Sequence, residues 1–357
     1  MIQETELVFV KKSIDARHKN IKLFLRYKVY IGEKPGDALK KIPQWKKADG
    51  SKTVLIIGSG PAGLFGALKL LEHGIKPVII ERGTDTSSRK RDIAAISTRG
   101  TVNSDSNYCF GEGGSGTFSD GKLYTRSNKR GDISGILKIF AHFGADEKIL
   151  TDAHPHIGTD RLPSIINSMR KMIVDCGGEF HFNTKCSGLI TENGTVTGVR
   201  AVDVLSGEER KFMADAVLLA TGHSADDIYR MIARESPQSL EAKTFAAGVR
   251  VEHPRILIDA IQYHGTLNNQ LGAAEYRITT QVDGRGVYSF CMCPGGFVVP
   301  SAQTVTINGD GSTVVKYYYA RKTYTVSVIL QNGEYGTVSP ATVTGVLHGA
   351  SISTTIP

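Results

Sequence analysis

Residues 53–83, TVLIIGSGPAGLFGALKLLEHGIKPVIIERG, restrict the fold of this chain more than any other segment. An apolar run, VLII, is followed by glycines in the spacing GxGxxG and by a helical pattern with Leu64, Leu68 and Leu71 on one side. A second apolar run then ends at Glu81. This order of strand, glycine turn, helix and strand predicts a parallel βαβ unit that binds a dinucleotide.

Each glycine of the GxGxxG turn, and the acidic residue at the end of the second strand, has its own physical role. Gly58 makes the tight turn, Gly60 lets the backbone approach a pyrophosphate, and Gly63 lets the helix and strand pack closely. The helix N-terminus supplies free N–H groups, and the Glu81 carboxylate accepts hydrogen bonds from a ribose. These arguments do not distinguish FAD from NAD. The predicted cofactor-binding residues of the unit are Gly58, Gly60, Pro61, Ala62, Gly63, Glu81 and Arg82.

Composition and charge exclude several classes of protein. Hydrophobic residues make up 40% and charged residues 22% of the 357 residues, which rules out a disordered or collagen-like chain. No apolar segment reaches the roughly 18 residues of a membrane span, and the N-terminus lacks a signal-peptide pattern, so we expect a cytoplasmic protein. The net charge of +8 is scattered, which argues against nucleic acid. Five cysteines, widely spaced apart from the pair Cys291 and Cys293, predict reduced thiols and no metal site, although that pair could also be redox-active or bind a metal.

Four domains are predicted from changes in pattern along the chain. Beyond the helix expected at 161–176, short strands form a β-meander with turns at 193–194 and 206–207, before a buried strand at 216–220. Basic residues at 40–47 suggest a solvated linker. The domains are an N-terminal α+β domain and linker at 1–50, a Rossmann-like α/β domain at 51–235, a partial substrate domain at 236–302, and a β-rich module at 303–357.

Several longer motifs resemble a known family. SNYCFGEGGSGTFSDGKLYTR, HPHIGTDRLP, ATGHSADDIY, AKTFAAGVRVEHP and GRGVYSFCMCPGGFVV are similar to segments of bacterial FAD-dependent proteins known as NAD(FAD)-utilising dehydrogenases. The resemblance covers roughly residues 5–302. A meander before the strand that ends in Ala220, Thr221 and Gly222 is also similar to FAD enzymes of the glutathione-reductase type. The fold implied is an FAD/NAD(P)-binding Rossmann-like domain of that type.

The resemblance implies bound FAD, with NAD(P)H as a candidate electron donor and a small molecule as substrate. It places a glycine-rich loop along the flavin, the backbone of Cys186 near the adenine, and Gly222 on the phosphate side. Asp120, Lys122 and His223 are polar candidates for catalysis, although each has a simpler interpretation as a hydrogen-bonded structural residue. The predicted loop residues are Gly113, Gly114, Ser115, Gly116 and Thr117.

The chain departs from the family after Ala302. INGDGSTVVKYYYARKTYTV and YGTVSP resemble the short β repeats of bacterial surface proteins, such as the internalin-type B repeat. Two functions therefore remain open. The first is an FAD-dependent oxidoreductase that passes a hydride between a pyridine nucleotide or small organic substrate and flavin. The second is a truncated or fused nucleotide-binding protein without catalysis, whose repeat serves interaction. The sequence leaves the substrate and the oligomeric state undetermined.

Overall fold

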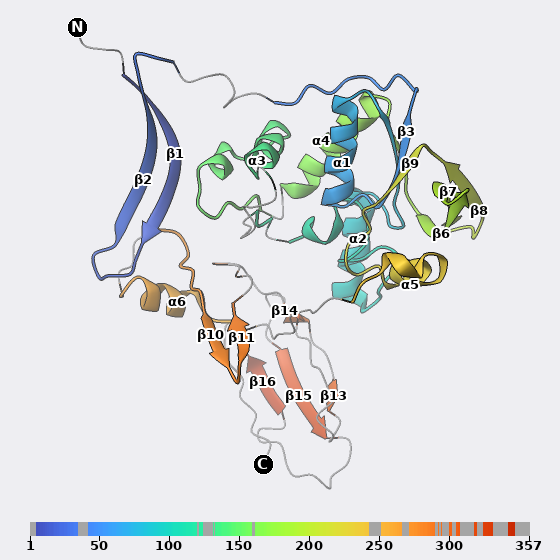
Figure 1. The fold of residues 1–357 in the computed structure, drawn as a ribbon. Helices are drawn as coiled ribbons and strands as arrows, with labels where there is room; N and C mark the ends of the chain where they lie inside the picture. The colour runs from blue at the N-terminus through green and yellow to red at the C-terminus, as the bar shows by residue number, and fades with distance from the viewer. Residues whose placement is uncertain are drawn as a thin grey trace. The chain divides into compact units, whose positions relative to one another are not determined.

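The computed structural model of the chain divides into two compact units, which are described separately. The first comprises Met1–Ile14 and Leu23–Ala246, and the second comprises Asp15–Lys22 and Ala247–Pro357. Figure 1 shows the helices and strands with their labels. The structure describes residues 5–34, 42–119, 121–123, 131, 133–158, 161–242, 251–265, 271–289, 292, 294, 300–301, 305–307, 318–319, 324–330 and 342–346.

A four-stranded sheet of parallel strands forms the centre of the first unit. Its strands lie in the order β5-β4-β3-β9, and each neighbouring pair is parallel. The VLII run is buried as predicted, with Leu55 and Ile56 at most 1% exposed. The α/β class with a Rossmann-like parallel sheet is therefore confirmed. The strands are β3 (Thr53–Ile57), β4 (Lys76–Ile80), β5 (Glu179–His181) and β9 (Ala216–Leu219).

Helices α1 (Pro61–Glu72) and α4 (Leu162–Asp175) pack together and share one hydrophobic core with the sheet. Helix α4 occupies the predicted segment, buries the expected apolar face and is followed by Gly177 at φ 93°. That left-handed backbone stops the helix because glycine adopts it without strain. The other helices described in this unit are α2 (Thr86–Arg99), α3 (Ile133–His142), α5 (Asp226–Glu235) and three short 3₁₀ helices (Gly114–Gly116, Glu147–Leu150, Pro237–Ser239).

The predicted meander is present as an antiparallel sheet in the order β6-β7-β8. Asn193 and Gly194 both have positive φ, as a two-residue hairpin turn requires. The EFHFNTKC segment is divided between two sheets because Asn183 at φ 53° separates β5 from β6. The strands are β6 (Thr184–Glu192), β7 (Thr195–Asp203) and β8 (Glu209–Met213).

Strand β9 corrects the expectation of a buried strand at 216–220. Among the described strands it pairs only with β3, at one edge of the parallel sheet. Leu218 and Leu219 are 39% and 37% exposed. The apolar composition of this strand predicted burial, but its position at the sheet edge leaves those side chains partly open.

The N-terminal region contains the predicted strands, and the assignment of residues 1–50 to an α+β domain and linker remains a prediction. Strands β1 (Thr5–Asp15) and β2 (Lys22–Ile31) pair as a two-stranded ribbon, and residues 5–34 contain no helix. Most of the apolar side chains on both strands are at least 37% exposed. The ribbon therefore builds no core of its own.

The described part of the predicted linker is partly docked and partly exposed, since Trp45 is half-buried whereas Lys46 and Lys47 are exposed. Trp45 stacks on Phe143, with ring centroids 5.3 Å apart, and also contacts His142. The backbone amides of residues 46, 48 and 49 donate to the carbonyl groups of residues 71, 176 and 74. This segment therefore docks on the ends of α1 and α4 through its backbone and Trp45, while Lys46 and Lys47 remain exposed.

The second unit contains a helix and short strands. Ile258, Tyr263 and Ala274 form a small buried cluster. Only strands are described among residues 303–357, where a β-rich module is predicted, and its turns at 308–311 and 332–333 lie outside the described residues. The elements are α6 (Arg255–Gln262), β10 (Thr279–Val282), β11 (Arg285–Tyr288), β12 (Pro300–Ser301), β13 (Val305–Ile307), β14 (Tyr318–Tyr319), β15 (Tyr324–Leu330) and β16 (Thr342–Val346).

In the described parts of the chain, no helix has both the length and the hydropathy needed to cross a bilayer. The division into four domains remains a prediction.

Candidate functional site

A cavity of about 470 Å³ lies at the carboxyl ends of β3, β4 and β9. The last residue of each strand contributes to its wall. In open α/β sheets this end is where ligands bind. Sixteen of its lining residues belong to the glycine turn, the end of β4, the glycine-rich loop and the turn after β9; they are Ile57, Gly58, Gly60, Pro61, Ala62, Ile80, Glu81, Arg82, Gly111, Gly114, Ser115, Leu219, Ala220, Thr221, Gly222 and His223.

The three glycines of the GxGxxG turn differ in the space around them. Gly58 has φ 104°, and a Cβ there would lie 2.6 Å from the Ala220 carbonyl oxygen. A Cβ on Gly63 would lie 2.0 Å from the Gly58 oxygen. A Cβ on Gly60 would meet only the Cα of Gly114, at 3.7 Å. Gly58 and Gly63 are therefore required by packing within the protein, whereas Gly60 borders open space in the cavity wall.

Glu81 ties three segments together at the floor of the cavity. Its carboxylate is 5% exposed and accepts four hydrogen bonds of 2.8–3.1 Å, from the amide and hydroxyl of Ser59 and from the amides of Gly83 and Gly111. A carboxylate has about four acceptor positions, so the protein itself fills them. The predicted ribose contact remains a prediction. Because the Ser59 hydroxyl is the one donor that can rotate, a ribose hydroxyl would replace it.

The predicted glycine-rich loop lies directly against the first turn. The Gly113 amide donates to the Ser59 carbonyl at 2.9 Å, and a Cβ on Gly114 would lie 3.2 Å from the Gly60 Cα. Gly114 and Ser115 line the cavity. Gly113 and Thr117 are buried behind it, since a Cβ on Gly113 would collide with the Thr117 hydroxyl at 2.1 Å. Of the five predicted loop residues, the structure thus brings two to the cavity surface.

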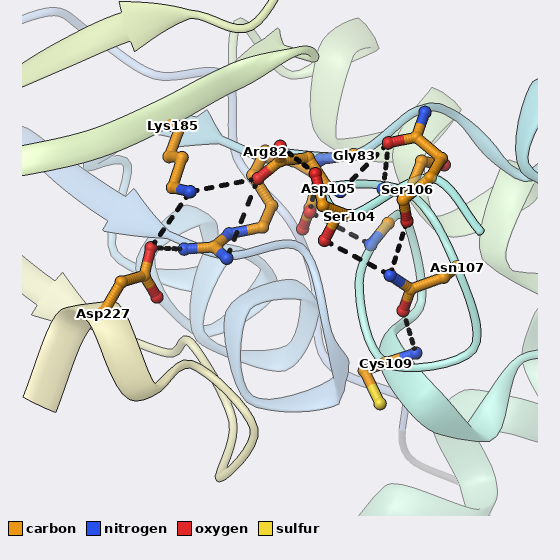
Figure 2. Close-up of polar contacts among 12 residues, drawn as sticks. Arg82, Gly83, Ser104, Asp105, Ser106, Asn107, Cys109, Lys185 and Asp227 are labelled. Atoms are coloured by element: carbon orange, nitrogen blue, oxygen red, sulfur yellow. Dashed lines mark hydrogen bonds and ion pairs between the residues drawn. The ribbon is translucent and has the colours of Figure 1, made fainter.

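Arg82 lines the cavity and is held by the acidic side chains of Asp105 and Asp227 (Figure 2). Its guanidinium forms an ion pair with Asp227, lies 3.9 Å from an Asp105 oxygen and stacks over the Phe110 ring at 4.3 Å. Lys185 bridges the same two carboxylates at 3.2 and 3.3 Å. The four charged residues come from four separate segments, so nothing in their spacing along the sequence predicted this cluster.

The charges of this cluster control the protonation of Asp227. Burial alone would raise the pKa of its carboxyl group. The hydrogen bond from Arg82 and the positive charges of Arg82 and Lys185 outweigh burial and lower that pKa. Asp227 is therefore ionised at neutral pH, and it fastens the start of α5 to the end of β4.

Some of the other predicted site residues line the cavity and others do not. Cys186 lines the cavity, and burial raises the pKa of its thiol to about 11. Gly222 also lines it, at φ 71°. His223 lines it with its Nδ1 3.1 Å from the Ser224 hydroxyl oxygen. Lys122 pairs with His156 in a β-bridge and is not among the lining residues. Asp120 lies outside the described residues.

A buried carboxylate within the loop segment 110–116 was not predicted. Glu112 is fully buried, accepts a hydrogen bond from the Thr86 amide at 2.8 Å and forms an ion pair with Arg170 at 2.9 Å. Burial raises the pKa of Glu112, and the backbone bond and Arg170 oppose that rise. The only sequence signal was an acidic residue inside an otherwise small and polar loop, FGEGGSG.

Three family models match the chain. Two models described as FAD binding domain match residues 51–105 and 125–247. A third, described as FAD-dependent protein, C-terminal domain-like, matches residues 244–333 and so crosses the predicted boundary at 302–303. The resemblance of the tail to a surface-protein repeat remains a prediction.

Two curated relatives share sequence with the chain. An uncharacterized protein of Clostridium beijerinckii is 37% identical over 316 residues, covering 84% of this chain and 58% of the relative. A probable glycerol-3-phosphate dehydrogenase of Encephalitozoon cuniculi is 30% identical over 112 residues, covering 28% of this chain and 18% of the relative. The chain thus spans less than two thirds of the length of either relative.

Solved structures show a more distant similarity. THI4 of Thermovibrio ammonificans has a TM-score of 0.35 and 17% identity, covering 52% of this chain and 63% of that one. The glycerol-3-phosphate dehydrogenase of Bacillus halodurans, complexed with FAD, has a TM-score of 0.34 and 16% identity, covering 52% of this chain and 37% of that one.

Proposed function

We propose that this chain, which matches two FAD binding domain models and one FAD-dependent protein model, is an oxidoreductase that passes a hydride between FAD and either a pyridine nucleotide or a small organic substrate. One observation carries the proposal: a single cavity at the carboxyl end of the sheet joins the glycine turn, the end of β4 and the glycine-rich loop. These are the parts that a dinucleotide needs.

The residues present fit FAD. The open space at Gly60 leaves room for a pyrophosphate, and the N-terminus of α1 offers its first backbone N–H groups and the positive end of its dipole. Arg82, Thr184 and Cys186 would hold the adenosine end, Gly222 would lie on the phosphate side, and Ser115 would border the flavin. When bound, FAD would supply the hydride chemistry.

This chain's own residues would then bind the cofactor, orient it and limit its contact with water. Ile228 and Ile232 give the cavity an apolar wall, which lowers the local dielectric. His223 lines the cavity beside Ser224, which supports it as the candidate that would contact a substrate. We include a cytoplasmic location in the proposal because Cys109, Cys176 and Cys186 are free cysteines.

The proposal is tested by loading the purified protein with FAD and measuring the visible flavin spectrum. We expect tight binding and, under anaerobic conditions, bleaching of the flavin bands by NADH or NADPH. If neither pyridine nucleotide bleaches them, a panel of small hydroxy acids, amines and alcohols is tried in the same cuvette. If the protein takes up no FAD, the proposal is wrong.

The exposed edge of the sheet favours a second candidate, a nucleotide-binding protein without catalysis. Leu219 lines the cavity and is 37% exposed, so water has access to that wall. Stable FAD binding without bleaching by any donor in the panel would support this second function over the first.

Cys109 gives an independent test of where FAD binds. Its side chain is exposed and the residue lines the cavity, whereas Cys176 and Cys186 are buried. We expect iodoacetamide to modify Cys109 at pH 8, and saturating FAD to slow that reaction severalfold by covering the thiol. Cys186 stays unmodified because its pKa of about 11 keeps the thiol protonated.

Peptide mapping by mass spectrometry measures each cysteine separately, and Cys176 serves as the buried reference. If FAD binds but the modification rate of Cys109 is unchanged, the ligand lies elsewhere and the placement is wrong.

A further inference from the structure

Arg89 is a completely buried arginine on α2, directly behind the glycine-rich loop. Its guanidinium donates to five backbone carbonyl groups and one hydroxyl. The acceptors are the carbonyl oxygens of Asn107 (2.9 Å), Tyr108 (3.2 Å), Gly111 (3.2 Å), Glu112 (2.7 Å) and Gly114 (2.8 Å) and the Thr117 hydroxyl (3.3 Å).

The described hydrogen-bond partners of the Arg89 guanidinium are dipoles. In the described part of the chain, its hydrogen bonds all go to carbonyl and hydroxyl oxygens rather than to a carboxylate. Burial lowers its pKa to about 10, while the nearby negative charges of Glu81 and Glu112 oppose that change. A buried cation whose direct partners are all dipoles is costly, so the carbonyl groups that satisfy Arg89 must stay turned toward it.

The loop is shaped to meet this guanidinium. Gly111 has φ 113°, and a Cβ there would lie 2.5 Å from the Arg89 Cδ. With three loop carbonyl groups turned toward Arg89, the other side of the loop faces the phosphate turn. There Gly114 lies so close to Gly60 and Pro61 that its Cβ would come within 3.1–3.2 Å of them. Arg89 and the Gly60 turn thus hold the loop from opposite sides.

We propose that Arg89 is a positioning residue for the pyrophosphate of the bound dinucleotide. It fixes the loop from Gly111 to Ser115 against Gly60 and places a positive charge beneath the cavity wall where the phosphates would lie. This inference rests on the proposed FAD binding and goes beyond it, because Arg89 contacts no ligand and lies outside the glycine turn.

The experiment compares Arg89→Met with Arg91→Met, a matched change to an exposed arginine on the same helix. Dissociation constants for FAD and for ADP, which keeps the pyrophosphate but has no flavin, are measured by calorimetry. We expect Arg89→Met to weaken both ligands by at least roughly tenfold, since hydrogen bonds to a charged group and its potential are lost together. Arg91→Met should bind both as the wild type does.

Three results would overturn the inference: wild-type affinity in Arg89→Met, weaker FAD with unchanged ADP, or an equal loss in Arg91→Met. If the wild-type protein bound neither ligand, the proposed function would fail together with the inference. Wild-type binding with an unaffected Arg89→Met would remove the inference alone.

Two further variants keep the test decisive if Arg89→Met does not fold. Arg89→Lys retains the charge without the planar fork, so its ADP affinity should fall between those of Arg89→Ala and the wild type. In Arg89→Ala, guanidinium chloride at concentrations well below those that unfold the protein should restore ADP binding, whereas equal sodium chloride should not. If neither Arg89→Lys nor guanidinium recovers affinity, Arg89 has only a folding role and the inference is wrong.

Discussion

Replacing Gly60 with valine is expected to abolish FAD binding while the fold stays intact. Gly60 has φ −70° and ψ −176°, which a non-glycine residue adopts without strain, and its Cβ would meet only Gly114 at 3.7 Å. The two methyl groups of valine would then fill the space that a pyrophosphate needs. Loss of a glycine at the helix N-cap costs about 1 kcal/mol at most. Calorimetric titration with FAD and the far-ultraviolet circular dichroism spectrum measure the two effects.

Gly60→Ala is the graded companion of this variant. A single methyl group makes an ordinary contact with Gly114, so its FAD affinity should lie between those of the wild type and Gly60→Val. Unchanged FAD affinity in Gly60→Val would show that the pyrophosphate does not bind at this turn.

Replacing Gly63 with alanine is expected to destabilise the whole first unit, whether or not FAD is present. The new Cβ would lie 2.0 Å from the Gly58 carbonyl oxygen, and backbone atoms cannot rotate away as a flexible side chain can. We expect a loss of about 3 kcal/mol or more in the free energy of unfolding, which lowers Tm by roughly 10 °C. Differential scanning calorimetry of the apoprotein measures the shift.

Gly66→Ala on the same helix is the matched control. Its Cβ would meet only the Leu218 Cδ2, at 3.0 Å, and that side chain can move aside. Alanine also favours a helix interior by about 1 kcal/mol relative to glycine, so the Tm of this variant should equal or exceed that of the wild type. A Gly63→Ala protein with wild-type Tm would contradict the packing role assigned to Gly63.

Local patterns predicted the regular parts of the fold. The glycine spacing gave the βαβ unit, the apolar periodicity gave α4, and Asn193-Gly194 gave the first hairpin of the meander. Each of these elements depends on residues close together in the sequence, so its physical cause can be read from the local pattern. The sheet edge was not predicted, because a strand of apolar residues looks the same in the centre and at the edge of a sheet.

The candidate site was predicted only in the part that is local. Gly58, Gly60 and Glu81 were found because their spacing is fixed by one turn and one helix. The contacts of Arg82 with Asp227, and of Arg89 with the loop, join residues up to 145 positions apart. Such partners depend on how the chain closes in space, and a charged residue met in a single sequence resembles any solvated one.

The docked segment before β3 has a spectroscopic consequence. Trp45 is the only tryptophan of the chain. It packs against His142, the last residue of α3, and against Phe143, which follows it. Tryptophan emission of this protein therefore reports on the attachment of residues 45–49 to the ends of α1, α3 and α4. Circular dichroism follows the helices and strands as a whole, so the two signals separate detachment of this segment from melting of the sheet.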